Sequence, residues 1–259
     1  MAMPFKTSLI LVLIMLFTNA AKASDDYVFI FGYGSLMLTP ARTATSPDPE
    51  GAVYIPVKIR GIERLWNLWS EYGQQRTLGV EQNKAPDAFV SGLIFAAKKD
   101  QLAAFDEREG PAYQRVQIPI ENVTFYLDNH QEIVAQSKRV TDIYVYSPRK
   151  ESSFYFDKSH DQKKIAMSYL NVVRAGCVEI DKTHQLNGLF VNDCVQTMGL
   201  EGYLVDDDRR APRYPRYPAT LLKKAIESGN TEKTEELQRF IQVEWKNYLN
   251  TISEKWEEK

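Results

Sequence analysis

The stretch from Tyr27 to Leu36 reads YVFIFGYGSL and joins an apolar segment to a glycine turn. The run of aromatic and β-branched residues up to Phe31 predicts a β-strand. Gly32 and Gly34 then permit a tight backbone turn. Such a turn exposes consecutive N–H groups, which can hold a carboxylate or a developing oxyanion. The alternative is an ordinary tight turn with no ligand.

Further apolar runs predict more strands along the chain. They span Ala52 to Ile59, Phe89 to Ala96, Val116 to Ile120 and Ile143 to Tyr146. Helical patterns lie between and after them. We therefore expect an α+β fold built on a curved, mostly antiparallel β-sheet or β-barrel, with a helical C-terminal extension.

The first predicted helix carries an acidic end. Asp100 is placed to cap it, Phe105 would point inward, and Gly110-Pro111 would end it. Its last turn reads DERE from Asp106 to Glu109. A positioned carboxylate here is a candidate general base, and the alternative is a solvated acidic face.

A second helix is predicted from a capping box formed by Ser159 and Gln162. Tyr169 would lie on its inward face, and Gly176 would close it. A further amphipathic run from residue 237 to residue 256 predicts a terminal helix packed on its own domain, with partner binding as the alternative.

The N-terminus has the pattern of an export signal. Lys6 precedes an apolar run from Leu9 to Phe17, and the small-x-small pattern Ala21-Lys22-Ala23 follows. The run is too short to cross a bilayer, which takes about 20 residues. We expect cleavage after Ala23, a mature protein without a membrane anchor, and a periplasmic or secreted location.

Two cysteines, Cys177 and Cys194, make an even count, which in an oxidising compartment predicts a disulfide; the alternative is two free thiols. The formal net charge of the whole chain is −2, so nucleic acid is not an expected partner.

Several other chemistries lack their motifs. The histidines His130, His160 and His184 have no second ligand at metal spacing, so no metal site is expected. The Gly-x-Ser-x-Gly pattern of serine hydrolases and the phosphate-binding and dinucleotide fingerprints are absent. We expect no cofactor.

Two motifs resemble those of the γ-glutamylcyclotransferase-like (AIG2-like) family. The family's Tyr-Gly-Ser after the first strand is matched by Tyr33-Gly34-Ser35, and its acidic segment ending in Glu-Gly is matched by residues 106–110. The resemblance implies that Glu109 is the catalytic glutamate. A substrate-contacting tyrosine seven residues before a glycine is matched by Tyr169 and Gly176.

The resemblance implies a fold and a reaction. The fold is a small mixed barrel with flanking helices, and the reaction releases 5-oxoproline from a γ-glutamyl amino acid, amine or glutathione-like peptide without a cofactor. It implies that Glu109 moves protons and that the substrate is held by Phe31, Gly32, Tyr33, Gly34, Ser35, Leu36 and Tyr169. The alternative is a non-catalytic protein of the same fold that binds a small anionic ligand.

The predicted organisation has three parts: a signal at residues 1–23, the family-like domain at 24–176, and an extension at 177–259 that is largely helical after residue 218. The extension contains a basic, proline-rich segment from Arg209 to Pro218. We expect a surface connection whose arginines pair with nearby acids; the alternative is a segment over the pocket mouth that attracts an anionic substrate. Trp66 and Trp69 are expected in the core.

Overall fold

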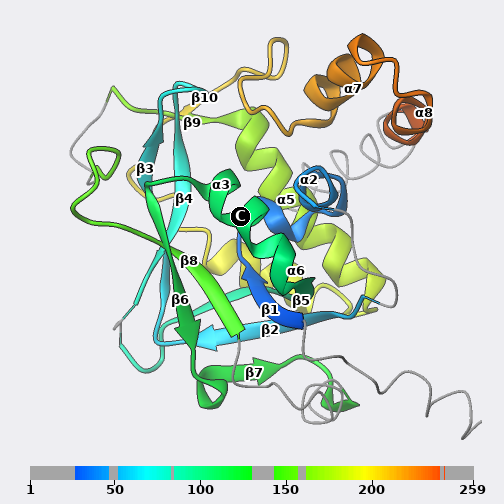
Figure 1. The fold of residues 1–259 in the computed structure, drawn as a ribbon. Coiled ribbons are helices and arrows are strands. Elements are labelled where there is room, and N and C mark those ends of the chain that lie inside the picture. Colours follow the sequence, from blue (N-terminus) through cyan, green and yellow to red (C-terminus); the bar gives the residue numbers. More distant parts are fainter. Residues whose placement is uncertain are drawn as a thin grey trace, which may run out of the picture.

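The computed structural model describes residues 27–46, 52–82, 85–129, 143–156, 162–239 and 242. In this part of the chain the strands form two sheets (Figure 1). The larger has the order β6-β8-β1-β5-β2-β7 and the smaller the order β10-β9-β4-β3. The strands are β1 (Tyr27–Gly32), β2 (Tyr54–Arg60), β3 (Glu63–Ser70), β4 (Gln75–Glu81), β5 (Phe89–Lys98), β6 (Tyr113–Ile118), β7 (Val123–Phe125), β8 (Ile143–Pro148), β9 (Ile165–Ala166) and β10 (Val205–Asp206).

Strand β1 lies in the middle of the larger sheet. It pairs antiparallel with β5, where Phe31 faces Ile94, and parallel with β8, where Phe29 faces Ile143. Its residues from Val28 onward are buried, which explains a continuous apolar run rather than an alternating one. The glycine turn therefore begins at the end of a strand that is fixed from both sides.

Among the described residues the larger sheet does not close into a barrel, so the structure does not support that part of the predicted fold. Its outer strands, β6 and β7, each pair on one side only in the part of the chain that the structure describes. The other predicted strands are present as β2, β5, β6 and β8, although β6 begins at Tyr113 and ends at Ile118. The fold is a mixed α+β arrangement of two open sheets with helices.

The helices are α2 (Thr39–Thr43), α3 (Leu102–Glu109), α5 (Met167–Thr183), α6 (Leu189–Gln196), α7 (Pro218–Glu227) and α8 (Thr231–Arg239), with short 3-10 helices η1 (Ser35–Met37), η2 (Lys99–Gln101) and η3 (Ile120–Asn122). In Figure 1, α3, α5 and α6 lie above the larger sheet, and α7 and α8 lie beyond α5. Among the described residues no helix is long and apolar enough to span a membrane.

Helix α3 ends as predicted but begins differently. Gly110 adopts φ 69°, a conformation that glycine tolerates, and its N–H bonds to the carbonyl of Asp106. The predicted cap by Asp100 was wrong, because this residue lies within η2 and the N-cap Gln101 makes no side-chain cap.

Helix α5 starts later and runs further than predicted. It begins at Met167, so the capping box of Ser159 and Gln162 was wrong: Gln162 precedes the helix, and Ser159 lies outside the described residues. Gly176 does not end the helix, which continues to Thr183. A Cβ atom at Gly176 would lie 2.8 Å from Cβ of Met37, so the glycine allows α5 to pack closely against η1.

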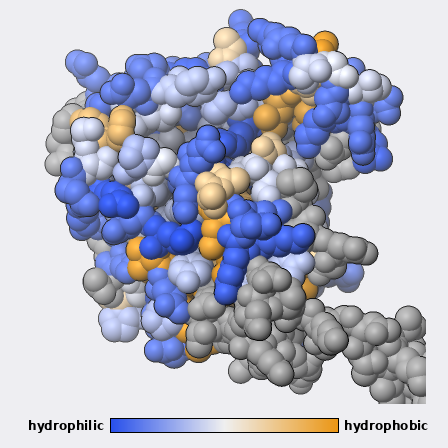
Figure 2. Space-filling model, viewed as in Figure 1, coloured by the Kyte–Doolittle hydropathy of each residue, from blue (hydrophilic) through white to orange (hydrophobic). Residues whose placement is uncertain are grey.

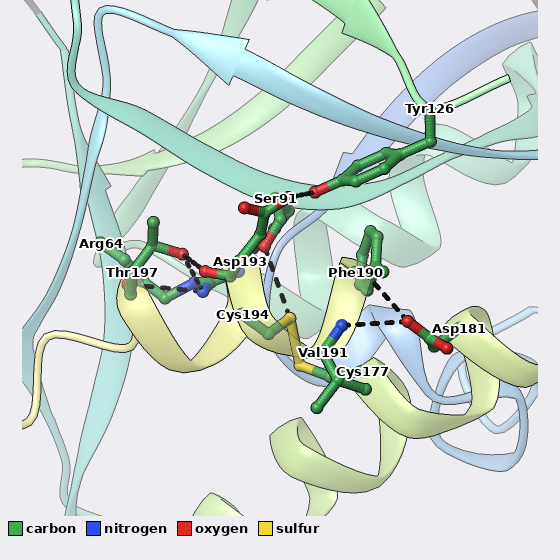
Figure 3. The surroundings of a disulfide bond; sticks show 10 residues. All are labelled: Arg64, Ser91, Tyr126, Cys177, Asp181, Phe190, Val191, Asp193, Cys194 and Thr197. Atoms are coloured by element: carbon green, nitrogen blue, oxygen red, sulfur yellow. Dashed lines mark hydrogen bonds between the residues drawn. A yellow bond between two sulfur atoms is a disulfide. The ribbon is translucent and has the colours of Figure 1, made fainter. Parts of the chain in front are cut away.

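The predicted disulfide between Cys177 and Cys194 is present and joins α5 to α6 (Figure 3). Asp181 of α5 reinforces this joint, because its carboxylate accepts hydrogen bonds from the N–H groups of Gly188 and Phe190 at 2.8 and 2.9 Å. It thereby serves as the N-terminal cap of α6 from another helix.

The predicted signal at residues 1–23 lies outside the described residues, as does most of the predicted terminal helix. Helix α8 begins earlier, at Thr231, and overlaps the predicted helix only at residues 237–239, where Leu237 is buried. The division into domains stays a prediction, although its boundary after Gly176 falls inside α5. Figure 2 shows a mostly hydrophilic face with small, separate apolar patches.

Candidate active site

A cavity of about 690 Å³ lies where the glycine turn, the end of α3 and the first turns of α5 meet strands β3 and β4. The turn contributes Ser35, α3 contributes Arg108 and Glu109, and α5 contributes Tyr169. Tyr113 adds to the wall from the start of β6. The cavity therefore brings together residues from both sequence motifs.

Arg108 connects the two motifs directly. Its Nη2 atom donates a hydrogen bond to Oγ of Ser35 at 2.7 Å, and its Nε atom lies 2.9 Å from Oε1 of Glu109. Its Nη1 atom also bonds to the carbonyl of Ala41 at 3.2 Å. The Arg108 side chain is only 4% exposed, so one buried guanidinium fixes the Glu109 carboxylate beside the turn.

Tyr169 closes the other side of the turn. Its hydroxyl accepts a hydrogen bond from the N–H of Leu78 at 3.4 Å, and its ring stacks on that of Tyr214 with 4.6 Å between centroids. A Cβ atom at Gly34 would lie 3.3 Å from this hydroxyl. Gly34 has φ −135°, so its place here depends on close packing rather than on a left-handed conformation.

The buried hydroxyls of Tyr33 and Tyr113 lie near enough to Glu109 to feel its charge. Tyr33 donates to the carbonyl of Tyr146 at 2.6 Å, and Tyr113 donates to the carbonyl of Leu78 at 2.7 Å. Burial raises the pKa of Tyr33 and of Tyr113 above its ordinary value, and the nearby carboxylate of Glu109 adds to both shifts. Both groups are therefore neutral hydrogen-bond donors at physiological pH.

The residues predicted from the sequence occupy three positions relative to the cavity. Ser35, Glu109 and Tyr169 line it, and Gly34 packs against Tyr169. The others, Phe31, Gly32, Tyr33 and Leu36, are buried behind the turn and do not line the cavity.

The extension also reaches the site. Tyr214, Pro215 and Arg216 line the cavity, so the expectation of a surface connection was wrong for this part of the segment. It holds for Arg209, which pairs with Asp207. The position of Arg216 agrees with the alternative given from the sequence, in which the basic, proline-rich segment lies over the pocket mouth.

Asp208 holds this segment on α5. Its carboxylate accepts hydrogen bonds from the N–H and the hydroxyl of Ser168 at 2.7 and 2.6 Å, and from the N–H of Arg213 at 2.8 Å. Burial alone would raise the pKa of Asp208, but these hydrogen bonds and the charge of Arg213 outweigh it and lower the pKa. Asp208 thus caps α5 and positions the residues that follow it.

The two tryptophans differ in their surroundings. Trp66 is fully buried, as predicted, and donates from Nε1 to the carbonyl of Met198 at 2.9 Å. Trp69 is half-buried and lines the cavity, so its placement in the core was wrong. Among the described residues, no group of three or more potential ligands could hold a metal ion.

Neither a scan against protein-family models nor a search of curated proteins finds a match. Solved structures similar to the chain include γ-glutamyl cyclotransferases. One has 16% identity and a TM-score of 0.46 and covers 68% of this chain and 90% of its own. A yeast γ-glutamyl cyclotransferase specific to glutathione has 13% identity, a TM-score of 0.42 and coverages of 67% and 96%.

An uncharacterized human protein has 18% identity and a TM-score of 0.44, and the match covers 63% of this chain and 88% of that protein. All three structures are less than 20% identical to this chain. Their TM-scores lie below 0.5.

Proposed function

We propose that the protein is a γ-glutamylcyclotransferase-type enzyme that releases 5-oxoproline from a γ-glutamyl compound. One observation carries the proposal: the Glu109 carboxylate lines a cavity beside the Ser35 turn and is fixed there by Arg108. A base held next to an anion-binding turn is what ring closure of a γ-glutamyl group requires, because the substrate carries a carboxylate and an ammonium on the same carbon.

The turn is proposed to hold the α-carboxylate. The first internal hydrogen bond of η1 runs from the N–H of Met37 to the carbonyl of Gly34, so the N–H of Ser35, a residue that lines the cavity, precedes it and has no acceptor within the helix. The buried Arg108 adds a positive charge at the same point. These features favour a bound carboxylate.

Glu109 is proposed to move the protons. Its Oε1 atom faces Arg108, whereas Oε2 has no hydrogen-bond partner among the described residues and is available to the substrate. It would take a proton from the α-ammonium, and the freed amine would then attack the γ-carbonyl carbon. The new C–N bond closes the five-membered ring, and correct positioning supplies much of the acceleration.

Collapse of the tetrahedral intermediate breaks the bond between the γ-carbon and the leaving nitrogen. Two protons leave the α-nitrogen during the reaction, and both end on the leaving amine, which departs as an ammonium while the lactam keeps one N–H. Protonated Glu109 can deliver a proton to the departing nitrogen and so return to its starting state.

The test is to incubate the protein with a panel of γ-glutamyl compounds and to measure 5-oxoproline. Glu109→Gln keeps the shape but cannot accept the proton, and we expect turnover to fall by roughly 10²- to 10⁴-fold with binding retained. Glu107→Gln is the matched control, because Glu107 is exposed on the same helix and its loss should have little effect.

Equal activity of the two variants would remove Glu109 from the mechanism. Binding of a γ-glutamyl compound without any 5-oxoproline would instead support a non-catalytic protein that binds a small anionic ligand. We also propose that the protein is exported, which is supported by the Cys177–Cys194 disulfide, because disulfides persist in oxidising compartments.

A further inference from the structure

The cavity has a second charged region that the reaction described above does not use. Arg216 lines it from the segment before α7, and Lys224 lines it from α7 itself. The only acidic residues that line the cavity, within the described part of the chain, are Glu109, already paired with Arg108, and the exposed Glu71. The region around Arg216 therefore has an excess of positive charge.

The guanidinium of Arg216 contacts Tyr214 but forms no direct ion pair among the described residues. The side chain is half-buried. Burial lowers the pKa of Arg216, and the nearby positive charge of Arg108 lowers it further; Tyr214 and the Glu109 carboxylate oppose this shift but do not cancel it. A partly desolvated guanidinium next to another cation is more stable when an anion binds to it.

Gln75 supplies a second unsatisfied group on the cavity wall. Its side chain is 1% exposed, and its Oε1 atom is buried without a hydrogen-bond partner among the described residues. It lies close to the extension, because Arg213 donates a hydrogen bond to the carbonyl of the preceding residue, Gln74, at 3.1 Å. A buried amide oxygen of this kind accepts an N–H donor from a ligand.

We propose that Arg216 binds a carboxylate on the amine that leaves in the reaction, while Gln75 accepts an N–H from the same group. The preferred substrates are then γ-glutamyl amino acids or peptides with a free carboxylate, and γ-glutamyl amines are poor substrates. This inference rests on the proposed cyclotransferase function and selects among the substrate classes which that function leaves open.

The Arg216 segment is held in a way that suits this role. Asp208 fixes the segment to the start of α5, and Tyr214 packs on Tyr169 at the cavity wall. Arg216 follows two residues later on a short connection into α7 that contains Pro215 and Pro218. Proline restricts the backbone, so the guanidinium is presented on a constrained chain.

The test compares two compounds that differ only in charge, γ-glutamyl-alanine and γ-glutamyl-alaninamide. With wild-type protein we expect kcat/KM for the acid to exceed that for the amide by about 10- to 100-fold, the range for a hydrogen-bonded charge. In Arg216→Gln the preference should disappear through loss of activity on the acid, and Arg216→Lys should restore part of it.

Arg209→Gln is the matched control. It removes the same charge from the same segment, but Arg209 is exposed and paired with Asp207, so the preference should remain. Equal kcat/KM for acid and amide in the wild-type protein would overturn the inference while the cyclotransferase function stands. So would an Arg216→Gln variant that loses activity on both compounds in equal proportion.

If no turnover is detected, binding measurements distinguish the proposed reaction from the proposed recognition of a carboxylate by Arg216. Calorimetric titration of the wild-type protein with both compounds should show the same 10- to 100-fold preference for the acid. If neither compound yields 5-oxoproline but the acid still binds more tightly, only the reaction is wrong. If acid and amide bind equally, or neither binds, Arg216 does not recognise a carboxylate.

Discussion

The Nη2 atom of Arg108 donates a 2.7 Å hydrogen bond to Oγ of Ser35, although the two residues are 73 positions apart in the chain. The same guanidinium contacts the carboxylate of Glu109, the proposed base. The position of this carboxylate and the position of the Ser35 turn therefore depend on each other. Arg108, which lies between Glu107 and Glu109 in the second motif, therefore joins the two sequence motifs into one structural unit.

Arg108→Gln should therefore damage both stability and catalysis. The change leaves a largely buried carboxylate without its cation, which costs roughly 3 kcal/mol in the free energy of unfolding. Urea denaturation measures the loss, and turnover should fall with it. Arg108→Lys should rescue little, because a single ammonium cannot reach Glu109, Ser35 and Ala41 together.

Arg115→Gln is the control for this prediction. Arg115 pairs with Asp106 on the surface near the end of the same helix, with 31% and 48% of the two side chains exposed. Its removal should cost less than about 1 kcal/mol. Similar losses for Arg108→Gln and Arg115→Gln would contradict the central role of Arg108.

Gly34 is expected to control ligand binding through its contact with Tyr169. A Cβ atom there would lie 3.3 Å from the tyrosine hydroxyl and 3.5 Å from Cδ2 of Leu78, so Gly34→Ala requires only a small shift. Gly34→Val places two more carbons in the same space and should abolish binding of a γ-glutamyl compound. A folded Gly34→Val protein with wild-type binding and turnover would make the turn purely structural.

Reduction of the Cys177–Cys194 disulfide should lower stability. The two cysteines are 17 residues apart, and closing a loop of this size stabilises the folded state by about 3 kcal/mol. Protein purified under oxidising conditions should have no titratable thiol after unfolding, and urea denaturation with and without reductant measures the difference. Two reactive thiols per chain would show that the bond does not form.

Stability should fall in acid through Asp208. The pKa of Asp208 is lowered in the folded protein. In the unfolded chain an aspartate titrates near pH 3.9, so around this pH Asp208 binds fewer protons in the folded state than in the unfolded state. The stabilisation of the folded state by ionised Asp208 is fully present above the unfolded-state pKa and is lost as the pH falls toward the folded-state pKa. In Asp208→Asn, urea denaturation should show a smaller loss between about pH 5 and pH 3 than in wild type.

The same variant should affect the cavity. Loss of the cap on α5 should release the Arg216 segment, so binding of γ-glutamyl-alanine should weaken more than binding of its amide. Asp207→Asn serves as the control, because Asp207 lies on the surface and pairs only with Arg209 among the described residues. Equal effects of Asp207→Asn and Asp208→Asn on the two ligands would argue against this anchoring.

The sequence predicts the parts of the site that lie next to regular elements. The strand up to Phe31 and the helix end at Gly110 follow from local patterns, and they flank the turn and Glu109. Strands β3 and β4 were missed because each contains a buried arginine, Arg64 or Arg76, that breaks the apolar pattern. Each of these arginines donates a hydrogen bond to a distant main-chain carbonyl, that of Ser91 or Lys163, and no local pattern reveals such contacts.

Gly176 shows a different limit of prediction. In the sequence a glycine after an amphipathic run indicates the end of a helix, but here it lies within α5 where the helix packs against Met37 and Leu38. The open form of the larger sheet escapes prediction for a similar reason, because whether β6 and β7 meet depends on the whole sheet and not on either strand.

The wall of the cavity is drawn from both ends of the described chain, from Ser35 near its start to Lys224 near its end. A chain that emerges from the ribosome can pair β1 with β5 long before Arg216 has been made. Cavity formation is therefore a late event in synthesis, and a truncated chain that retained the sheets would still lack a complete site. Catalytic activity would then require that almost the entire described polypeptide has been synthesised and folded.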